Sequence, residues 1–104
     1  MIAAAVMAVV GGSLEIVECE LVGPREHEVR VKITASGVCH SDLGVLSGIV
    51  SVPLPMVLVH EACGTVTKVG PGVRLVAVGD QVIMGPELQC GQCFFCSRGQ
   101  PELC

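Results

Sequence analysis

Hydrophobic and polar residues alternate along much of this chain with a period of two, the pattern of a β-strand that has one face covered. The clearest example is residues 28–35, where Val29, Val31 and Ile33 share one face and charged or polar residues share the other. The alternation predicts a strand over this range. Other strand-like segments, bounded by glycines and prolines, are residues 3–10, 14–21, 56–61, 64–69 and 81–84.

The connections between these segments add a hairpin and one helix. Gly11 and Gly12 separate the first two segments, which predicts a β-hairpin there. The alternation stops at residues 36–43, where polar and titratable side chains gather. A short helix is predicted over residues 41–46, with Ser41 or Asp42 near its N-terminus, because such side chains accept hydrogen bonds from free backbone N–H groups.

Composition supports a mostly β fold. Val, Ala and Leu dominate a hydrophobic fraction of 51%, and Phe94 and Phe95 are the only aromatic residues. The 104 residues include 13 glycines and 6 prolines, which divide the chain into short segments. Folds built from many short strands have this punctuation. We expect one mostly β domain whose apolar half suffices for a hydrophobic core.

The charges exclude some classes of partner. The net charge is −4, and the six basic residues are scattered rather than gathered into a stripe that could hold phosphates. We therefore expect no nucleic-acid partner. The apolar start, residues 1–12, lacks a basic leader region and is too short to span a bilayer, so we expect no membrane association. Seven cysteines without an obvious pairing fit a reducing, cytoplasmic location.

The C-terminal segment carries the most specific motif in the chain. Cysteines stand at positions 90, 93, 96 and 104, with the spacing C-x2-C-x2-C-x7-C. Tight C-x2-C loops bring two thiolates onto one ion, and four thiolates complete the tetrahedron of a structural zinc site. No strand or helix period runs through the segment, so a metal ion would hold it together. The motif predicts structural Zn²⁺ bound by Cys90, Cys93, Cys96 and Cys104.

Three other interpretations of these cysteines remain open. Disulfides would leave one of the seven cysteines unpaired, and Cys90 and Cys93 are too close in sequence for an easy bridge. Ferredoxin-type iron–sulfur motifs continue as C-x3-C-P, whereas here seven residues precede Cys104 and no proline follows it. The cysteines could also be free thiols of the protein interior.

A second group of residues has the chemistry of a catalytic metal site. Cys39 and His60 are separated by 20 residues, and each lies beside a carboxylate, Asp42 or Glu61. A thiolate and an imidazole are common ligands of catalytic zinc, which keeps one position open for substrate. A ligating histidine usually donates its second ring N–H to a carboxylate, and Asp42 could accept it. Without further context, a buried cysteine and a surface histidine would explain the same pattern.

Together these motifs resemble one family closely. Residues 37–42 read Gly-Val-Cys-His-Ser-Asp, residues 60–64 read His-Glu-Ala-Cys-Gly, and the four-cysteine segment follows. In this order and at these separations they resemble the N-terminal half of the zinc-dependent medium-chain alcohol dehydrogenases. The resemblance implies a mostly β fold: a GroES-like, partly open β-barrel with a short helix and a structural-zinc lobe at about residues 86–104. Because the sequence stops within that lobe, we expect residues 1–104 to be the N-terminal part of such a domain, truncated at its C-terminus.

The resemblance also implies metal ligands. Cys39 and His60 match two ligands of the family's catalytic zinc, whose third ligand comes later in the family's chain. Glu61 matches a carboxylate that can approach this metal, and Asp42 matches the hydrogen-bond partner of the histidine ligand. The positions that match the structural-zinc ligands are Cys90, Cys93, Cys96 and Cys104.

Two further positions match residues that act on substrate and coenzyme. Ser41 matches the hydroxyl that hydrogen-bonds the substrate alcohol and starts a proton relay, and His40 matches a residue that touches the pyrophosphate of the coenzyme in some members. One position departs from the family pattern. Val59 stands where a glycine normally precedes His-Glu, which puts a β-branched side chain next to His60.

In this family an alcohol is oxidised to an aldehyde or ketone. Zinc acts as a Lewis acid that lowers the pKa of the alcohol, and hydride passes to the nicotinamide of NAD(P). The resemblance therefore implies a small alcohol or aldehyde substrate and a homo-oligomer only for the full-length form. No Gly-x-Gly-x-x-Gly turn follows a strand here, so we expect the Rossmann coenzyme domain to be absent. We expect the 104-residue chain alone to be inactive.

Other functions remain open at the level of sequence. A non-catalytic zinc-binding module, from a truncated or split gene, would keep the cysteine lobe without catalysis. An iron–sulfur electron carrier would absorb visible light, whereas a zinc protein is colourless. Zinc-free quinone reductases belong to the same broad family, but they generally lack both the cysteine lobe and the Cys/His ligand pair.

Overall fold

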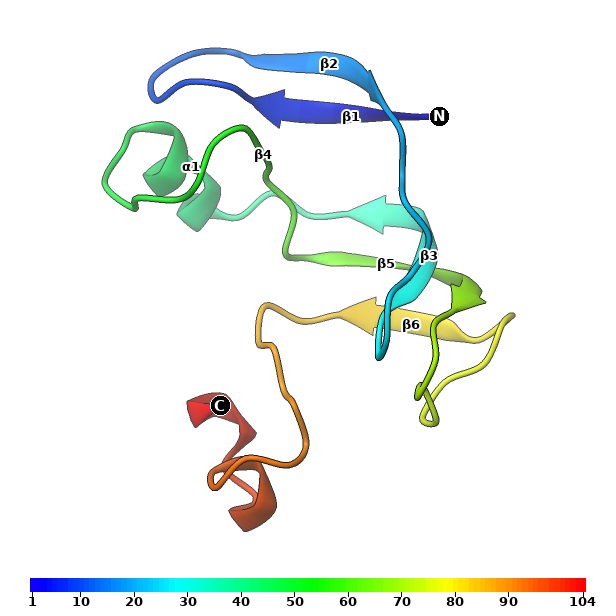
Figure 1. Ribbon diagram of the computed structural model, residues 1–104. Coiled ribbons are helices and arrows are strands. Elements are labelled where there is room, and N and C mark those ends of the chain that lie inside the picture. Colours follow the sequence, from blue (N-terminus) through cyan, green and yellow to red (C-terminus); the bar gives the residue numbers. More distant parts are fainter.

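Six strands form two three-stranded sheets in the computed structural model, which describes residues 1–104 (Figure 1). The first sheet contains β1 (Ile2–Met7), β2 (Leu14–Cys19) and the short β4 (Met56–Val57), in the order β2-β1-β4. Both β2 and β4 pair with β1 antiparallel. The hairpin predicted around Gly11 and Gly12 is confirmed.

The second sheet positions most of the residues of interest. It contains β3 (Val29–Ser36), β5 (Ala62–Val69) and β6 (Gln81–Met84), in the order β3-β5-β6. Both neighbours of the central β5 run antiparallel to it. The strands predicted over residues 28–35, 64–69 and 81–84 are confirmed, with ends that differ by two residues or fewer.

The strand-like segment at residues 56–61 is different from the prediction. Only Met56–Val57 pair as a strand, in the first sheet, and β5 of the second sheet begins at Ala62. Residues 58–61 carry the chain from one sheet to the other and lie outside both strands. The apolar pattern of residues 56–61 therefore predicted a longer strand than the chain forms.

The helical elements are short. The helix α1 (His40–Leu46) starts one residue earlier than predicted, with Cys39 as its N-cap and Asp42 in its first turn. The backbone N–H of Cys39 donates to Asp42 Oδ2 at 2.9 Å. Two 3-10 turns, η1 (Cys96–Arg98) and η2 (Pro101–Leu103), lie in the C-terminal lobe. None of the helices is long and apolar enough to cross a membrane.

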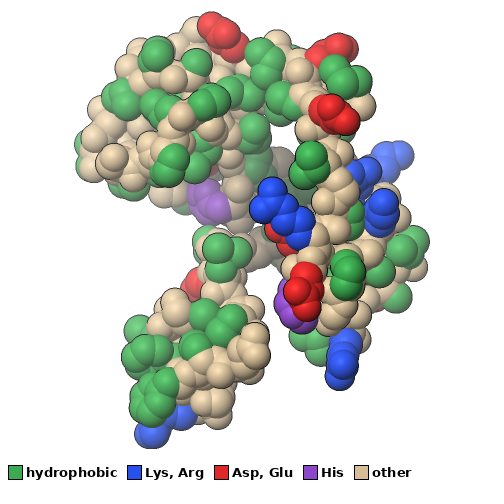
Figure 2. Space-filling view, viewed as in Figure 1, with side chains coloured by type: hydrophobic (Ala, Val, Ile, Leu, Met, Phe, Trp, Pro, Cys, Tyr) green, Lys and Arg blue, Asp and Glu red, His purple; other side chains and the backbone are tan.

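The hydrophobic core is smaller than the apolar composition would allow. Only 5 of 104 residues are buried, among them Met7, Ala62 and Val66. The radius of gyration is 15.3 Å, against about 13 Å for a compact domain of this length. Two features explain the difference: the sheets do not close around a common interior, and the lobe projects from the rest of the chain (Figure 1). Apolar side chains consequently appear across much of the surface (Figure 2).

The centre of the second sheet is packed closely despite the small core. Gly64 in β5 pairs with Ile33 on one side and Val82 on the other. A Cβ at Gly64 would overlap the backbone carbonyl of Lys32 and meet the Val31 side chain at 2.9 Å. Because a strand backbone cannot move aside like a side chain, glycine is required here for space.

We expect Gly64→Ala to lower the free energy of unfolding by about 1–3 kcal/mol, the usual cost of overpacking a close contact. Urea unfolding followed by far-UV circular dichroism measures it. The matched control is Gly85→Ala, because a Cβ at Gly85 meets nothing within 4 Å. Equal unfolding midpoints for the two variants would show that β3 and β5 are not packed as described.

Candidate metal centres

Pairing between β3 and β5 brings together two segments that are distant in sequence. At the end of this ladder Ser36 lies opposite Ala62. One step further, the backbone N–H of Gly37 donates to the carbonyl of Glu61 at 2.8 Å. Cys39 therefore lies beside His60 as a direct result of strand register.

The ligand atoms of Cys39, His60 and Glu61 all lie within 4.8 Å of one another, and we call this group the Cys39 cluster. The ring of His60 is held from several sides. Its Nδ1 lies 3.3 Å from Asp42 Oδ1, and its Nε2 lies 3.3 Å from Ser41 Oγ and 3.6 Å from Glu61 Oε1. Five residues that the sequence singled out thus meet at one place.

The cluster favours the thiolate form of its cysteine. Hydrogen bonds from Ser41, and then from His60, lower the pKa of the Cys39 thiol. A hydrogen bond with Cys39, aided by the charges of Asp42 and Glu61, raises the pKa of His60. A thiolate is the form of cysteine that binds metals, so the surroundings of Cys39 suit a ligand.

The donor set fits a zinc ion. Ligand atoms around tetrahedral zinc lie about 3.3–3.8 Å apart, and the mixed S, N and O donors here are those of catalytic zinc sites. The three atoms, within 4.8 Å of one another, need only small side-chain movements to reach that spacing. Val59, the departure from the family pattern, is 44% exposed and does not keep His60 out of the cluster.

Two hollows adjoin the Cys39 cluster. One of about 210 Å³ includes Ser41, Asp42 and His60 among its lining residues. Its apolar wall contains Val45, Val50, Met56, Val57, Leu58 and Val59. The other, of about 520 Å³, borders His60 and Glu61 on the side of β6. His60 therefore borders both hollows.

His40 lies apart from the Cys39 cluster. It is exposed at the start of α1 and borders a different hollow of about 410 Å³, together with Gly11, Gly12 and Ser47. Of the site residues proposed from residues 39–61, His40 alone is absent from the contacts around the His60 ring.

The second candidate centre lies in the lobe. The four sulfur atoms of Cys90, Cys93, Cys96 and Cys104 lie within 4.8 Å of one another. Tight turns aim backbone N–H groups at these sulfurs: Cys90 Sγ accepts from Gln92 and Cys93 at 3.5 and 3.2 Å, and Cys93 Sγ accepts from Cys96 at 3.4 Å. Cys104 Sγ accepts from the N–H of Cys90 at 3.4 Å, which joins the end of the lobe to its start.

The thiols of the lobe differ in acidity. The backbone N–H groups of Gln92 and Cys93, followed by the Cys104 side chain, lower the pKa of Cys90 to about 6. At Cys104 the N–H of Cys90 lowers the pKa, but the side chains of Cys90 and Cys96 outweigh it and raise the pKa to about 11. Cys90 and Cys104 thus share a proton unequally, with the thiolate favoured at Cys90.

Side-chain packing in the lobe was not anticipated from the sequence. Phe94 and Phe95 meet edge to face, with ring centroids 5.4 Å apart, and the Arg98 guanidinium lies 5.0 Å from the centroid of Phe94. These contacts cover little area, since Phe94 remains 65% exposed. The two phenylalanines therefore do not form a buried core within the lobe.

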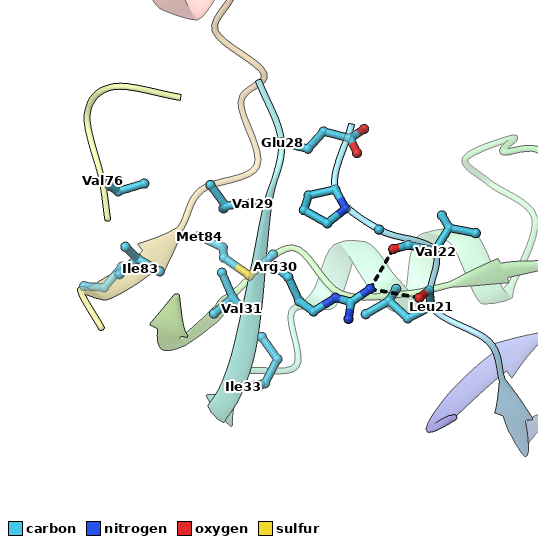
Figure 3. Close-up of a pocket in the computed structure, with 13 residues that line it drawn as sticks. Leu21, Val22, Glu28, Val29, Arg30, Val31, Ile33, Val76, Ile83 and Met84 are labelled. Atoms are coloured by element: carbon cyan, nitrogen blue, oxygen red, sulfur yellow. Dashed lines mark hydrogen bonds between the residues drawn. The ribbon is translucent and has the colours of Figure 1, made fainter. Parts of the chain in front are cut away.

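An apolar hollow of about 440 Å³ lies along β3 (Figure 3). Val29, Val31 and Met84 point into it from the second sheet (Figure 3). Across the strand edge, Arg30 Nη2 donates to the carbonyls of Leu21 and Val22, each at 2.9 Å. The arginine thus fastens the preceding loop to β3, and none of the predicted site residues lies here.

Comparison with known proteins identifies the family of the chain. Residues 25–104 match the family model of the alcohol dehydrogenase GroES-like domain. The chain is 45% identical over 101 residues to an NDMA-dependent alcohol dehydrogenase of Amycolatopsis methanolica, covering 97% of this chain and 27% of that protein. It is 48% identical over 102 residues to an S-(hydroxymethyl)glutathione dehydrogenase of Synechocystis, covering 97% of this chain and 28% of that protein.

Solved structures give the same result. The benzyl alcohol dehydrogenase of Acinetobacter calcoaceticus superposes with a TM-score of 0.91 at 39% identity, over 98% of this chain and 28% of that one. An alcohol dehydrogenase zinc-binding domain protein from Burkholderia ambifaria gives 0.91 at 40% identity, over 98% of this chain and 27% of that one. The chain therefore spans less than a third of the length of these relatives. From the match over residues 25–104 and the fold it shares with these enzymes, the chain belongs to the alcohol dehydrogenase GroES-like domain family.

Proposed function

We propose that this chain is the zinc-binding, N-terminal part of the catalytic domain of an NAD(P)-dependent alcohol dehydrogenase that acts on a small alcohol or aldehyde. The observation that carries the proposal is the Cys39 cluster, in which a cysteine, a histidine and a glutamate lie within 4.8 Å of one another. The Ser41 hydroxyl lies 3.3 Å from the histidine of that cluster. Family membership supports the same conclusion.

In this proposal Cys39 and His60 hold a catalytic zinc, with Glu61 within reach of the same ion. Zinc would supply a Lewis acid that lowers the pKa of a bound alcohol. Asp42 Oδ1, 3.3 Å from His60 Nδ1, orients the imidazole so that Nε2 faces the cluster. Ser41 Oγ is placed to accept a proton from the alcohol, and the apolar wall of the 210 Å³ hollow suits the carbon chain of a small substrate.

Residues 1–104 contain no Gly-x-Gly-x-x-Gly turn after a strand, the turn that binds the pyrophosphate in Rossmann domains. We propose His40 as a residue that contacts the pyrophosphate of NAD(P). Its support is its exposed position at the start of α1, outside the Cys39 cluster.

The lobe favours a second candidate function, a non-catalytic zinc-binding module. Its four sulfurs lie within 4.8 Å of one another and do not involve the Cys39 cluster. We propose Cys90, Cys93, Cys96 and Cys104 as ligands of a structural zinc. A chain that binds zinc only in the lobe would serve this second function, so metal content separates the two candidates.

We expect the purified chain to bind two zinc ions, one for each group of ligands. Removing one lobe thiol with Cys93→Ser, or one cluster thiol with Cys39→Ala, should leave one ion, because each change removes a ligand from one site only. Inductively coupled plasma mass spectrometry measures the zinc content. The matched control is Cys19→Ala, since Cys19 lies in β2 outside both groups. One ion in the unsubstituted chain, lost in Cys93→Ser, would favour the non-catalytic module.

Orientation of His60 by Asp42 gives a separate prediction. We expect Asp42→Asn to weaken zinc binding at the Cys39 cluster about 10- to 100-fold, the usual effect of losing the carboxylate partner of a histidine ligand. Asparagine keeps an oxygen that can accept the N–H of Cys39, so the start of α1 should be preserved. Competition with a chromophoric chelator measures the affinity. Unchanged affinity would show that Asp42 only caps the helix.

Activity requires the rest of the enzyme, so a chimera tests it. We expect no NAD⁺-dependent oxidation of a primary alcohol by the isolated chain, and activity when the chain replaces its matching segment in the Synechocystis relative. In the chimera, Ser41→Ala should lower kcat about 100-fold or more, because a positioned proton acceptor is lost. Ser51→Ala, at an exposed serine outside the cluster, is the control. A folded, zinc-loaded chimera without activity would contradict the proposed function.

A further inference from the structure

Gly37 lies at the junction between the second sheet and the Cys39 cluster. It follows β3 directly, and its N–H donates to the carbonyl of Glu61 at 2.8 Å. The hydroxyl of Ser36 donates to the same oxygen at 3.3 Å. In an antiparallel pair, side chains of residues that face each other lie on the same face of the sheet. A side chain at position 37 would therefore share its space with the side chain of Glu61.

The Glu61 side chain occupies that space. A Cβ at Gly37 would lie 2.7 Å from Glu61 Oε2 and 3.4 Å from Glu61 Cβ. Gly37 is not among the glycines with a positive φ, so its backbone conformation does not require glycine. The requirement is one of space alone.

The two carboxylate oxygens of Glu61 have different neighbours. Oε2 lies 2.7 Å from the position that a Cβ at Gly37 would occupy, while Oε1 lies 3.6 Å from His60 Nε2. The carboxylate is the far end of a flexible side chain and is about half exposed. A methyl group at position 37 would therefore displace the carboxylate from the cluster and leave the backbone in place.

We propose that Gly37 is a positioning residue. Because it has no side chain, the Glu61 carboxylate can lie close enough to the ligand atoms of Cys39 and His60 to bind the same ion. This inference rests on the proposed metal site at the Cys39 cluster. Gly37 precedes the cluster in sequence and has no side chain that could itself bind the ion. The site thus depends on the β3–β5 pairing both for its ligands and for the room that one ligand needs.

The test measures the affinity of the Cys39 cluster for Zn²⁺ in the 104-residue chain, with the lobe already loaded. We expect Gly37→Ala to weaken this affinity about 10-fold, within the range for residues that orient a ligand. The visible absorption of Co²⁺ at the cluster should change as well, because it reports the ligand arrangement. Zinc in the lobe and the urea unfolding midpoint should not fall. Gly85→Ala, where a Cβ meets nothing within 4 Å, should behave like the unsubstituted chain.

A double-mutant cycle separates positioning from a general structural effect. In a Glu61→Ala background, Gly37→Ala should cause no further loss of Zn²⁺ affinity, because the displaced carboxylate is already gone. Equal losses in both backgrounds would overturn the inference, and so would unfolding of Gly37→Ala, which would mean that the backbone needs glycine.

The outcomes also distinguish this inference from the proposed function. If the unsubstituted chain binds a second ion and Gly37→Ala binds it equally well, only the role of Gly37 is wrong. If the unsubstituted chain binds no ion at the Cys39 cluster, the proposed catalytic site and the role of Gly37 are both wrong.

Discussion

The antiparallel pairing of β3 with β5 is the interaction on which the Cys39 cluster depends. The ladder ends with Ser36 opposite Ala62 and is extended by the hydrogen bond from Gly37 to Glu61. A slip of one residue in this register would turn every side chain of one strand to the opposite face. Cys39 and His60 would then no longer meet. Close packing at Gly64 opposes such a slip, because the neighbouring backbone leaves no room for a side chain there.

Because the buried core is small, the backbone hydrogen bonds between strands and the contacts within the two ligand groups matter more for holding the chain together. Only Met7, Ala62 and Val66 are buried apolar side chains, although half of the composition is hydrophobic. The lobe has even less apolar support, since its two phenylalanines are partly or largely exposed. Its order comes from N–H groups that point at sulfur atoms, an arrangement that an ion would complete.

The ligand atoms of the lobe and those of the Cys39 cluster are brought together in different ways. In the lobe the donors are close in sequence, and tight turns aim backbone N–H groups at them. At the Cys39 cluster the donors come from a helix N-cap and from the approach to a strand, and neighbouring side chains orient them. The lobe is therefore a local structure, whereas the cluster exists only when the second sheet has formed.

This difference explains how much the sequence determined. Alternation identified β3, β5 and β6, because side-chain direction along a strand is a local property, and C-x2-C spacing identified the lobe for the same reason. The motifs around Cys39 and His60 singled out residues that the structure brings together, but the sequence contains no distance between them. Only the tertiary structure decided that they meet, that residues 58–61 connect the two sheets instead of lengthening a strand, and that Gly37 makes room for Glu61. The tertiary structure also decided that many apolar side chains stay exposed. Composition gives the number of hydrophobic residues, but it does not say whether the two sheets close over them.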